Sequence, residues 1–203
     1  MNTIEPKTRL FISTYEADYP WLHFLLASIE KYARGFSGIT IVCDNDKSQI
    51  PQDTLNIIRS MPLDVIYVDP PVSKPPAMVT RIGYMWQQVI KLGWWQYCSE
   101  DVCVQVDSDC IFKQTFTPDA FKDRHGKWIW HYRLWETMDN TRWKPSTEKL
   151  LGISNLKNQG MLGRYFVLTR DCTKRLVEYI SNKPAELWDW NFCIDNNIEQ
   201  FSE

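Results

Sequence analysis

Short apolar runs that end in polar residues alternate with helical patterns through the first half of the chain, and this alternation constrains the fold most strongly. The apolar runs cover residues 9–14, 39–43, 63–68 and 102–106. Between the first two, apolar residues spaced three and four apart from Trp21 onward indicate an amphipathic helix. Strands that alternate with helices are joined by crossover connections and form a mostly parallel sheet. The sequence therefore predicts an α/β fold that is doubly wound in its first half.

Further elements are expected along the rest of the chain. Gly35 and Gly38 are predicted to end the first helix, and two more helices are expected at 55–59 and 80–92. In the second half we expect a strand at 128–132, a strand at 165–168 and a helix at 171–180. No internal repeat or low-complexity tract interrupts the pattern, which indicates one domain.

The fourth apolar run ends in two acidic residues, Asp107 and Asp109, separated by Ser108. Neighbouring carboxylates repel each other, and removing either from water costs free energy unless a cation or hydrogen-bond donors compensate. Hard ions such as Mg²⁺ and Mn²⁺ prefer oxygen ligands and keep coordination positions for water and phosphate. The pattern predicts a metal site for a phosphate-bearing ligand. The alternative is an ordinary turn, in which Asp and Ser side chains bind the local backbone.

Polar residues also follow the first two predicted strands. Thr14 and Tyr15 come at the end of the first, and Asp44 opens an acidic cluster after the second. The carboxyl ends of parallel strands meet at one edge of a sheet, which is where ligands bind in folds of this class. The alignment of three polar clusters along one edge favours the metal site over the turn.

Composition limits the class of protein. The 203 residues suffice for one domain whose core needs no disulfide or metal staple. The net charge of −2 excludes a general basic field for a long nucleic acid, although a local basic groove stays open. Six cysteines without a Cys-x-x-Cys pair indicate a reducing compartment. The sequence has no signal peptide and no apolar stretch of about 20 residues, so we expect a soluble, cytoplasmic protein without a membrane span.

With its Asp-x-Asp motif at the end of a central strand, the chain resembles nucleotide-sugar glycosyltransferases of the GT-A fold. The similarity extends to a largely uncharacterised family of glycosyltransferase-like proteins from bacteria and phages through Gln87–Leu92, Phe112–Phe116, His131 and Phe201–Glu203. The resemblance implies a Rossmann-like three-layer α/β/α sandwich around a mostly parallel mixed sheet. It also implies a single domain, with a nucleotide-binding half at 1–112 and an acceptor-side half at 113–203.

The resemblance assigns roles to the polar residues. Asp109 and Asp107 would hold Mn²⁺ or Mg²⁺, which neutralises the charge growing on the departing diphosphate. His131 would be a third metal ligand or an acceptor contact, with a structural histidine as the alternative. The remaining donor-binding candidates are Thr14, Tyr15, Asp44, Arg81, Lys91, Ser108 and Asn158. For several of them an ordinary role stays open: packing for Tyr15, a helix-dipole contact for Lys91 and a turn for Asn158.

Transfer with inversion needs a carboxylate that takes the proton of the acceptor hydroxyl. Asp189 and Glu203 are the candidates. Asp189 lies among Trp188 and Trp190, whose rings would form an acceptor platform or, alternatively, pack against the sheet. Glu203 lies in a family-like Phe-Ser-Glu at the last residue given, and a chain end is a poor mount for a catalytic base.

These observations together predict metal-dependent transfer of a hexose or pentose from a nucleoside diphosphate sugar, most plausibly a UDP-linked one, to a hydroxyl acceptor. The acceptor is open between protein, lipid, glycan and a hydroxylated base in phage DNA, and a phage protein would act in the host cytoplasm. Two alternatives remain. One is a haloacid-dehalogenase-like phosphohydrolase, which also uses Asp-x-Asp, and the other is a binding protein that holds the nucleotide sugar without turnover.

Overall fold

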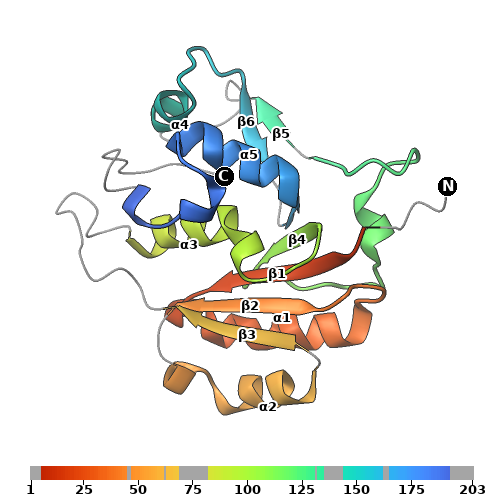
Figure 1. Ribbon diagram of the computed structural model, residues 1–203. Helices are drawn as coiled ribbons and strands as arrows, with labels where there is room; N and C mark the ends of the chain where they lie inside the picture. Colours follow the sequence, from red (N-terminus) through yellow and green to blue (C-terminus); the bar gives the residue numbers. More distant parts are fainter. Residues whose placement is uncertain are drawn as a thin grey trace. The chain divides into compact units, whose positions relative to one another are not determined.

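The computed structural model describes residues 6–44, 47–61, 63–68, 82–130, 132–134, 144–161 and 165–192, with the backbone alone at 44, 47, 82–83, 132–134 and 158–161. The chain forms two compact units, and Figure 1 shows the helices and strands of both. The first draws on residues 1–69, 94–129 and 164–170, and the second on 70–93, 130–163 and 171–203. The units interleave along the chain. The division into a nucleotide-binding and an acceptor-side half at residue 112 stays a prediction.

The first unit contains a five-stranded sheet in the order β3-β2-β1-β4-β7. Its strands are β1 (Thr8–Thr14), β2 (Ile39–Asp44), β3 (Leu63–Val68), β4 (Val102–Asp107) and β7 (Tyr165–Thr169). The first four are parallel, and β7 pairs with β4 in the antiparallel sense. This mixed, mostly parallel sheet with its helices confirms the predicted α/β class. Every residue of β1 is buried, which explains why its apolar residues run consecutively instead of alternating.

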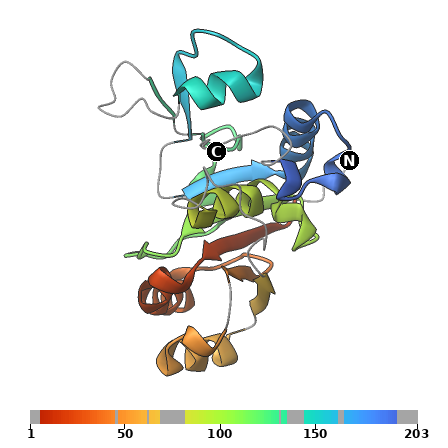
Figure 2. The ribbon, with the colours of Figure 1, turned by 90° about the vertical axis from the view of Figure 1, so that its left-hand side faces the viewer.

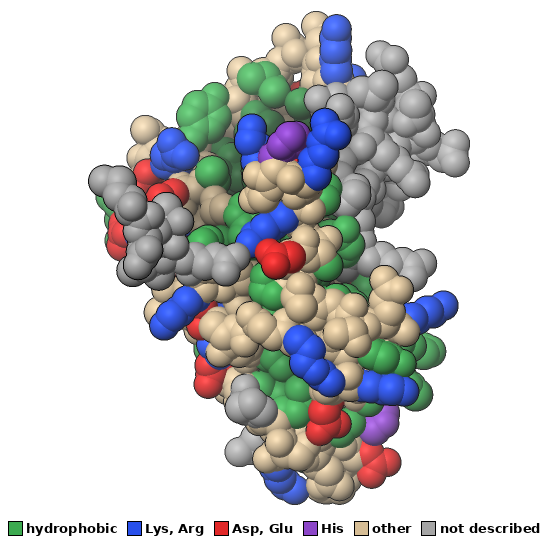
Figure 3. Space-filling model, turned by 90° about the vertical axis from the view of Figure 1, so that its right-hand side faces the viewer, with side chains coloured by type: hydrophobic (Ala, Val, Ile, Leu, Met, Phe, Trp, Pro, Cys, Tyr) green, Lys and Arg blue, Asp and Glu red, His purple; other side chains and the backbone are tan. Residues whose placement is uncertain are grey.

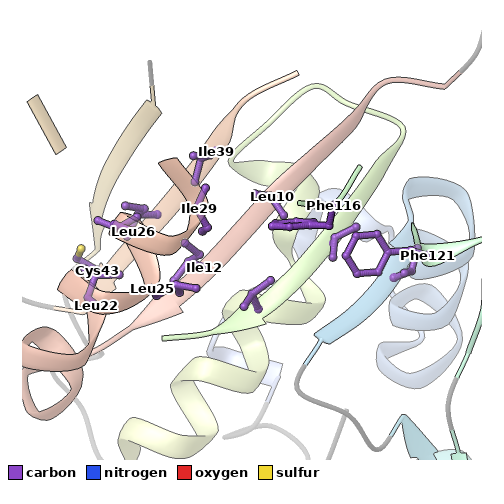
Figure 4. Packing of buried hydrophobic residues seen from close by; sticks show 14 of the residues in the cluster. Leu10, Ile12, Leu22, Leu25, Leu26, Ile29, Ile39, Cys43, Phe116 and Phe121 are labelled. Carbon is purple, nitrogen blue, oxygen red and sulfur yellow. The ribbon is translucent and has the colours of Figure 1, made fainter. Parts of the chain in front are cut away.

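Helices α1 (Tyr19–Tyr32) and α2 (Gln52–Ser60) cover one face of this sheet (Figure 1, Figure 2). Within the apolar stripe predicted for α1, Leu22, Leu25, Leu26 and Ile29 are buried and join side chains of the sheet in one hydrophobic cluster, whereas Trp21 is exposed. Figure 4 shows part of this cluster, which includes Leu10, Ile12, Leu22, Leu25, Leu26 and Ile29. The helix ends at Tyr32, and Gly35 then adopts a positive φ of 75°, a conformation that glycine tolerates without strain.

A buried arginine ties the strands together at their amino ends. The guanidinium of Arg9 donates to Glu100 at 2.9 Å and to the Thr40 hydroxyl at 2.7 Å, and it also pairs with Asp64. These partners precede or begin β4, β2 and β3, so one side chain links four strands. The guanidinium of Arg9 passes so close to residue 38 that a side chain there would clash, because a Cβ on Gly38 would lie 2.7 Å from Nη1 of Arg9.

A second arginine holds the segment that leads into β4. Arg170 follows β7 and donates to the backbone carbonyls of Trp95 at 3.3 Å, Cys98 at 2.6 Å and Glu100 at 2.8 Å. Its guanidinium also lies 5.3 Å from the ring centroid of Trp94, within the range of a cation–π interaction. Carbonyls that would otherwise lack donors in a loop are satisfied in this way.

The second unit consists of α3 (Ile82–Leu92), α4 (Lys144–Leu151), the antiparallel pair β5 (Tyr132–Leu134) and β6 (Asn158–Met161), and α5 (Arg170–Ser181), which continues from β7. Tryptophans pack the chain after α5 against α3. The indole of Trp188 donates to the carbonyl of Val89 at 2.9 Å, and the rings of Trp86 and Trp190 meet edge to face at 5.8 Å. Gly93 gives Trp188 room, because a Cβ there would lie 2.9 Å from its ring.

Several predicted elements differ in the second half. The strand expected at 128–132 is reduced to an isolated bridge between Lys122 and Trp128, and a strand begins at Tyr132. Asn158 lies in β6 and pairs with Leu134, so the turn considered for this position is wrong. The sequence pattern does not predict helix α4. Strand β6 depends on pairing with β5, a partner distant in sequence, and local periodicity does not report such partners.

The described residues can be compared with the expectations about cysteines, membrane spans and charge. Cys43, Cys98, Cys103, Cys110 and Cys172 are all free thiols. Within the described ranges, no helix combines the length and the apolar composition needed to cross a bilayer. On the face shown in Figure 3, several Lys and Arg side chains flank a histidine, and the others are scattered with Asp and Glu among them.

Candidate functional site

The carboxyl ends of β1 and β4 form the point at which the strand order of the sheet reverses. From β1 the chain runs outward through β2 and β3 and then returns to β4 on the other side of β1. The two strands are in register, with Ser13 opposite Asp107. Ligands of open α/β sheets bind beside the carboxyl ends of the strands at such a switch point. The Asp-x-Asp motif therefore lies where this topology places a binding site.

Alternation along the strands separates the side chains of the motif. Ser108 continues the face of β4 that packs on α1, and its side chain is 1% exposed. Asp107 has the opposite parity and is partly buried, while Asp109 lies past the strand and is exposed. Thr14, on the α1 side of β1, is 2% exposed, and its hydroxyl has no hydrogen-bond partner among the described residues.

Asp18 joins the motif from a different part of the chain. It ends the 3-10 helix η1 (Glu16–Asp18) and precedes α1, but its carboxylate does not cap that helix. Instead, Oδ2 of Asp18 accepts a hydrogen bond of 2.9 Å from the hydroxyl of Ser108. Burial raises the pKa of Asp18, and the negative charges of Asp109 and Asp107 raise it further, against the opposing effect of the Ser108 hydrogen bond. Three carboxylates thus lie within electrostatic reach of one another.

Tyr15 lies at the same edge and feels the same charges. Its side chain is 40% exposed and follows β1 directly. Burial raises the pKa of the Tyr15 hydroxyl, and the charges of Asp18 and Asp109 add to the rise. The ring is therefore available to a ligand, while its hydroxyl is close enough to interact with Asp18. An exposed aromatic face beside acidic side chains suits a planar base attached to a charged phosphate–metal group.

The residues present suit a metal that shares its coordination with a ligand. Among the residues that the structure describes, no three His, Cys, Asp or Glu side chains are grouped closely enough to enclose an ion. Mg²⁺ and Mn²⁺ are commonly held by one or two carboxylates, with substrate phosphates and waters completing the shell. Asp107 and Asp109 match that arrangement. A cation there would relieve the repulsion that these charges add to the effect of burial on the pKa of Asp18.

The other predicted donor contacts are placed less completely. Asp44 ends β2, at the same edge as Thr14, but its side chain lies outside the described residues, as does that of Asn158 in β6. Lys91 is in α3 of the second unit and is 4% exposed, so it is not on a solvated helix face. Arg81, His131 and Glu203 lie outside the described residues.

The aromatic platform proposed around Asp189 is wrong. Trp188 and Trp190 are 3% and 5% exposed because both rings pack against α3, so neither offers a face to an acceptor. The carboxylate of Asp189 is exposed and accepts hydrogen bonds from the backbone and side-chain amide groups of Asn191 at 2.9 and 3.0 Å. It lines a surface cavity of about 510 Å³ together with Lys183 and Glu186. A role for Asp189 as base stays a prediction.

Asp18 is the site residue that sequence reasoning missed. The available signal was its position in the short connection between the first strand and the first helix, four residues after Thr14. Such connections lie at the carboxyl edge of a parallel sheet, where functional residues gather. Its proximity to Ser108, ninety residues later in the chain, comes from the pairing of β1 with β4.

Comparisons with known proteins give a family and partial structural similarity. Residues 6–203 match a family described as a family of unknown function, DUF6492. No curated protein matches the sequence. The crystal structure of TarS from S. aureus matches at 18% identity and a TM-score of 0.37, over 54% of this chain and 18% of that one. The apo structure of WbbM, a bifunctional glycosyltransferase, matches at 13% identity and a TM-score of 0.38, over 57% and 21%. In both cases the chain spans less than a third of the matched protein, and similarity at this level establishes no shared function.

Proposed function

The chain belongs to DUF6492, whose description states no activity, and we propose from the site itself that the protein is a metal-dependent glycosyltransferase. It would move a sugar from a nucleoside diphosphate sugar, with UDP as the first nucleotide to test, to a hydroxyl acceptor. The observation that carries the proposal is the gathering of Asp18, Asp107 and Asp109 at the switch point between β1 and β4.

Charge decides what this edge can bind. Three carboxylates beside a partly exposed tyrosine repel an anionic ligand unless a cation accompanies it. A nucleoside diphosphate with Mn²⁺ or Mg²⁺ supplies the cation, phosphate oxygens for its remaining coordination and a flat base. When bound, the metal would stabilise negative charge on the departing diphosphate. A nucleotide sugar combines these features with a bond between the sugar and the diphosphate, which breaks when the diphosphate leaves.

The described residues take distinct roles in this proposal. Asp107 and Asp109 would hold the metal, and Tyr15 would stack on the base. The hydroxyl of Ser108 is buried and already engaged by Asp18, so we assign Ser108 to positioning the motif against α1 instead of contacting the donor. Thr14, with its unpartnered buried hydroxyl, remains a candidate for a donor contact.

For the remaining predicted residues we propose roles in the same mechanism. Asp44 would bind the ribose or base, Arg81 and Lys91 the diphosphate, and Asn158 the sugar, with His131 as a further metal ligand. Asp189 or Glu203 would accept the proton of the acceptor hydroxyl. In the transfer, that hydroxyl oxygen forms a bond to the anomeric carbon of the sugar, and the bond from that carbon to the diphosphate breaks.

The test is release of nucleoside diphosphate from UDP-glucose, UDP-galactose and UDP-N-acetylglucosamine, with Mn²⁺ or with EDTA. We expect metal-dependent release of UDP, slow with water and faster with an acceptor. Asp109→Asn should lower the rate at least about a hundredfold, because removing one charge-stabilising group from a site typically costs this much.

The matched control is Asp101→Asn. Asp101 is exposed and directly precedes β4, at the end of the strand opposite to the one that Asp109 follows. The Asp101→Asn variant has the same chemical change as Asp109→Asn and should keep at least half of the wild-type rate. Release of inorganic phosphate in place of UDP would support the phosphohydrolase alternative, and UDP-sugar binding without any product would support a binding protein.

A further inference from the structure

The segment that follows β4 runs along α1, and two hydrogen bonds fix its position. Ser108 donates to Asp18 at 2.9 Å, just before α1, and the backbone amide of Phe112 donates to the hydroxyl of Ser28 at 3.1 Å. Between these anchors the chain first turns, because the backbone amide of Cys110 donates to the carbonyl of Asp107 at 3.1 Å. The residues after the turn then reach the side of α1 at Ser28.

Large apolar side chains reach the solvent between these two anchors. On α1, Trp21 and Phe24 share a helix face with Ser28, because residues three and seven positions apart lie on one side. Their side chains are 55% and 49% exposed, and their ring centroids are 6.3 Å apart. On the neighbouring segment, Ile111 is 56% exposed and directly precedes the anchor at Phe112. We call Trp21, Phe24 and Ile111 the α1 platform.

The α1 platform adjoins the acidic site. Asp109 lies in the same segment, two residues before Ile111, and Asp18 lies three residues before Trp21. Exposure of two large rings costs free energy in water, and neighbouring exposed apolar residues commonly mark a binding surface. Since Asp109 is exposed, a ligand on the platform would meet a carboxylate at its end nearest the strand.

The charge around the platform selects the kind of ligand. Segments 13–24 and 105–114 are fully described, and they contain four carboxylates and one lysine, Lys113. A polyanion such as DNA, or an anionic lipid surface, would be repelled by this balance. A neutral saccharide fits it, because its hydroxyls donate hydrogen bonds to carboxylates and its apolar C–H face stacks on aromatic rings.

We propose that the α1 platform is the acceptor subsite and that it binds a neutral, hydroxyl-rich saccharide. This inference rests on the proposed function and specifies its acceptor. Trp21 and Phe24 bind one face of a sugar ring, and the next ring or hydroxyl extends toward Asp109 and the donor. The aromatic surface expected beside Asp189 thus has its counterpart on α1, where the rings are exposed instead of buried.

Binding measured separately for each ligand tests the inference. Maltotriose, cellotriose, chitotriose and a ten-residue oligothymidylate are titrated by NMR saturation transfer into protein with UDP and Mg²⁺, which is diamagnetic. We expect at least one trisaccharide to bind more tightly than the oligonucleotide. Trp21→Ala should weaken that binding about tenfold, the size of one lost stacking contact, while Trp21→Phe should restore most of it.

The control variant is Tyr179→Ala, which removes another exposed ring, 65% accessible, from α5. It should leave saccharide binding unchanged. Calorimetric binding of UDP with Mn²⁺ separates the two proposals: its absence in the wild-type protein overturns the donor site itself. If UDP binds, any of three results overturns the acceptor subsite. These are equal saccharide affinity in Trp21→Ala and wild type, preferential binding of the oligonucleotide, and no saccharide binding at all.

Discussion

At the scale of single residues, the buried ion pair of Arg9 and Glu100 contributes to the stability of the first unit. The side chain of Glu100 is 8% exposed and accepts hydrogen bonds of 2.9 Å from Arg9 and from Ser37. Burial alone would raise the pKa of Glu100, but these hydrogen bonds and the charge of Arg9 hold the pKa below its ordinary value of 4.5. A carboxyl group whose pKa is lower in the folded than in the unfolded state stabilises the fold at pH values above its unfolded-state pKa. This stabilisation is lost as the pH falls through the folded-state pKa.

We therefore predict that Glu100→Gln lowers the free energy of unfolding by about 2 kcal/mol at pH 7, the cost of losing hydrogen bonds that involve a charged group. The variant should also lose less stability than wild type on acidification below the ordinary carboxyl pKa. Urea unfolding at pH 7 and at acidic pH measures both effects. An equal loss on acidification in the two proteins would contradict the pKa argument.

Gly38→Ala tests the same network by steric means. The new Cβ would lie 2.7 Å from Nη1 of Arg9 and would displace the guanidinium. We expect a loss of about 2 kcal/mol, typical of overpacking. Because the displaced arginine no longer serves Glu100, combining Gly38→Ala with Glu100→Gln should cost less than the sum of the single changes. Additive losses in the double variant would show that the two positions act independently.

At the scale of elements, Arg170 joins the end of β7 to the segment before β4. Replacement by Met removes donors from the carbonyls of Trp95, Cys98 and Glu100. We expect about 3 kcal/mol of destabilisation, because buried carbonyls then lack partners. Arg175→Met is the control: Arg175 is exposed on α5, and among the described residues its hydrogen bonds are long ones within its own helix. Thermal unfolding should show a small change for the control and a large one for Arg170→Met.

The elements also differ in how far the sequence predicts them. Strands β1 to β4 and helices α1 and α2 follow from local periodicity, because each buries a continuous run or one stripe. Local periodicity does not predict that β7 is antiparallel or that β6 pairs with β5. An apolar run has the same pattern whichever direction the strand takes in the sheet. The sequence predicts a possible platform at Trp188 and Trp190 because tryptophan is common both in protein cores and at binding surfaces.

At the scale of the whole molecule, the donor should stabilise the fold by mass action. A ligand at a hundred times its dissociation constant adds about 2.7 kcal/mol, which corresponds to roughly 5–10 °C in melting temperature for a chain of this size. We expect this shift with UDP and Mn²⁺ together, a smaller one with either alone, and its removal by EDTA. Asp109→Asn should abolish it and Asp101→Asn should keep it. A shift that survives Asp109→Asn would place the ligand elsewhere.

The sequence by itself determined the parallel strands of the first half and the position of the acidic motif at the end of a buried strand. Both follow from local patterns: apolar runs form buried strands, and adjacent carboxylates occur where such a strand meets solvent. Only the tertiary structure decided that Asp18 belongs with Asp107 and Asp109, and that Trp21 and Phe24 are exposed while Trp188 and Trp190 are buried. The physical reason is that burial and electrostatic coupling depend on which distant segments meet, and β1 meets β4 across about ninety residues.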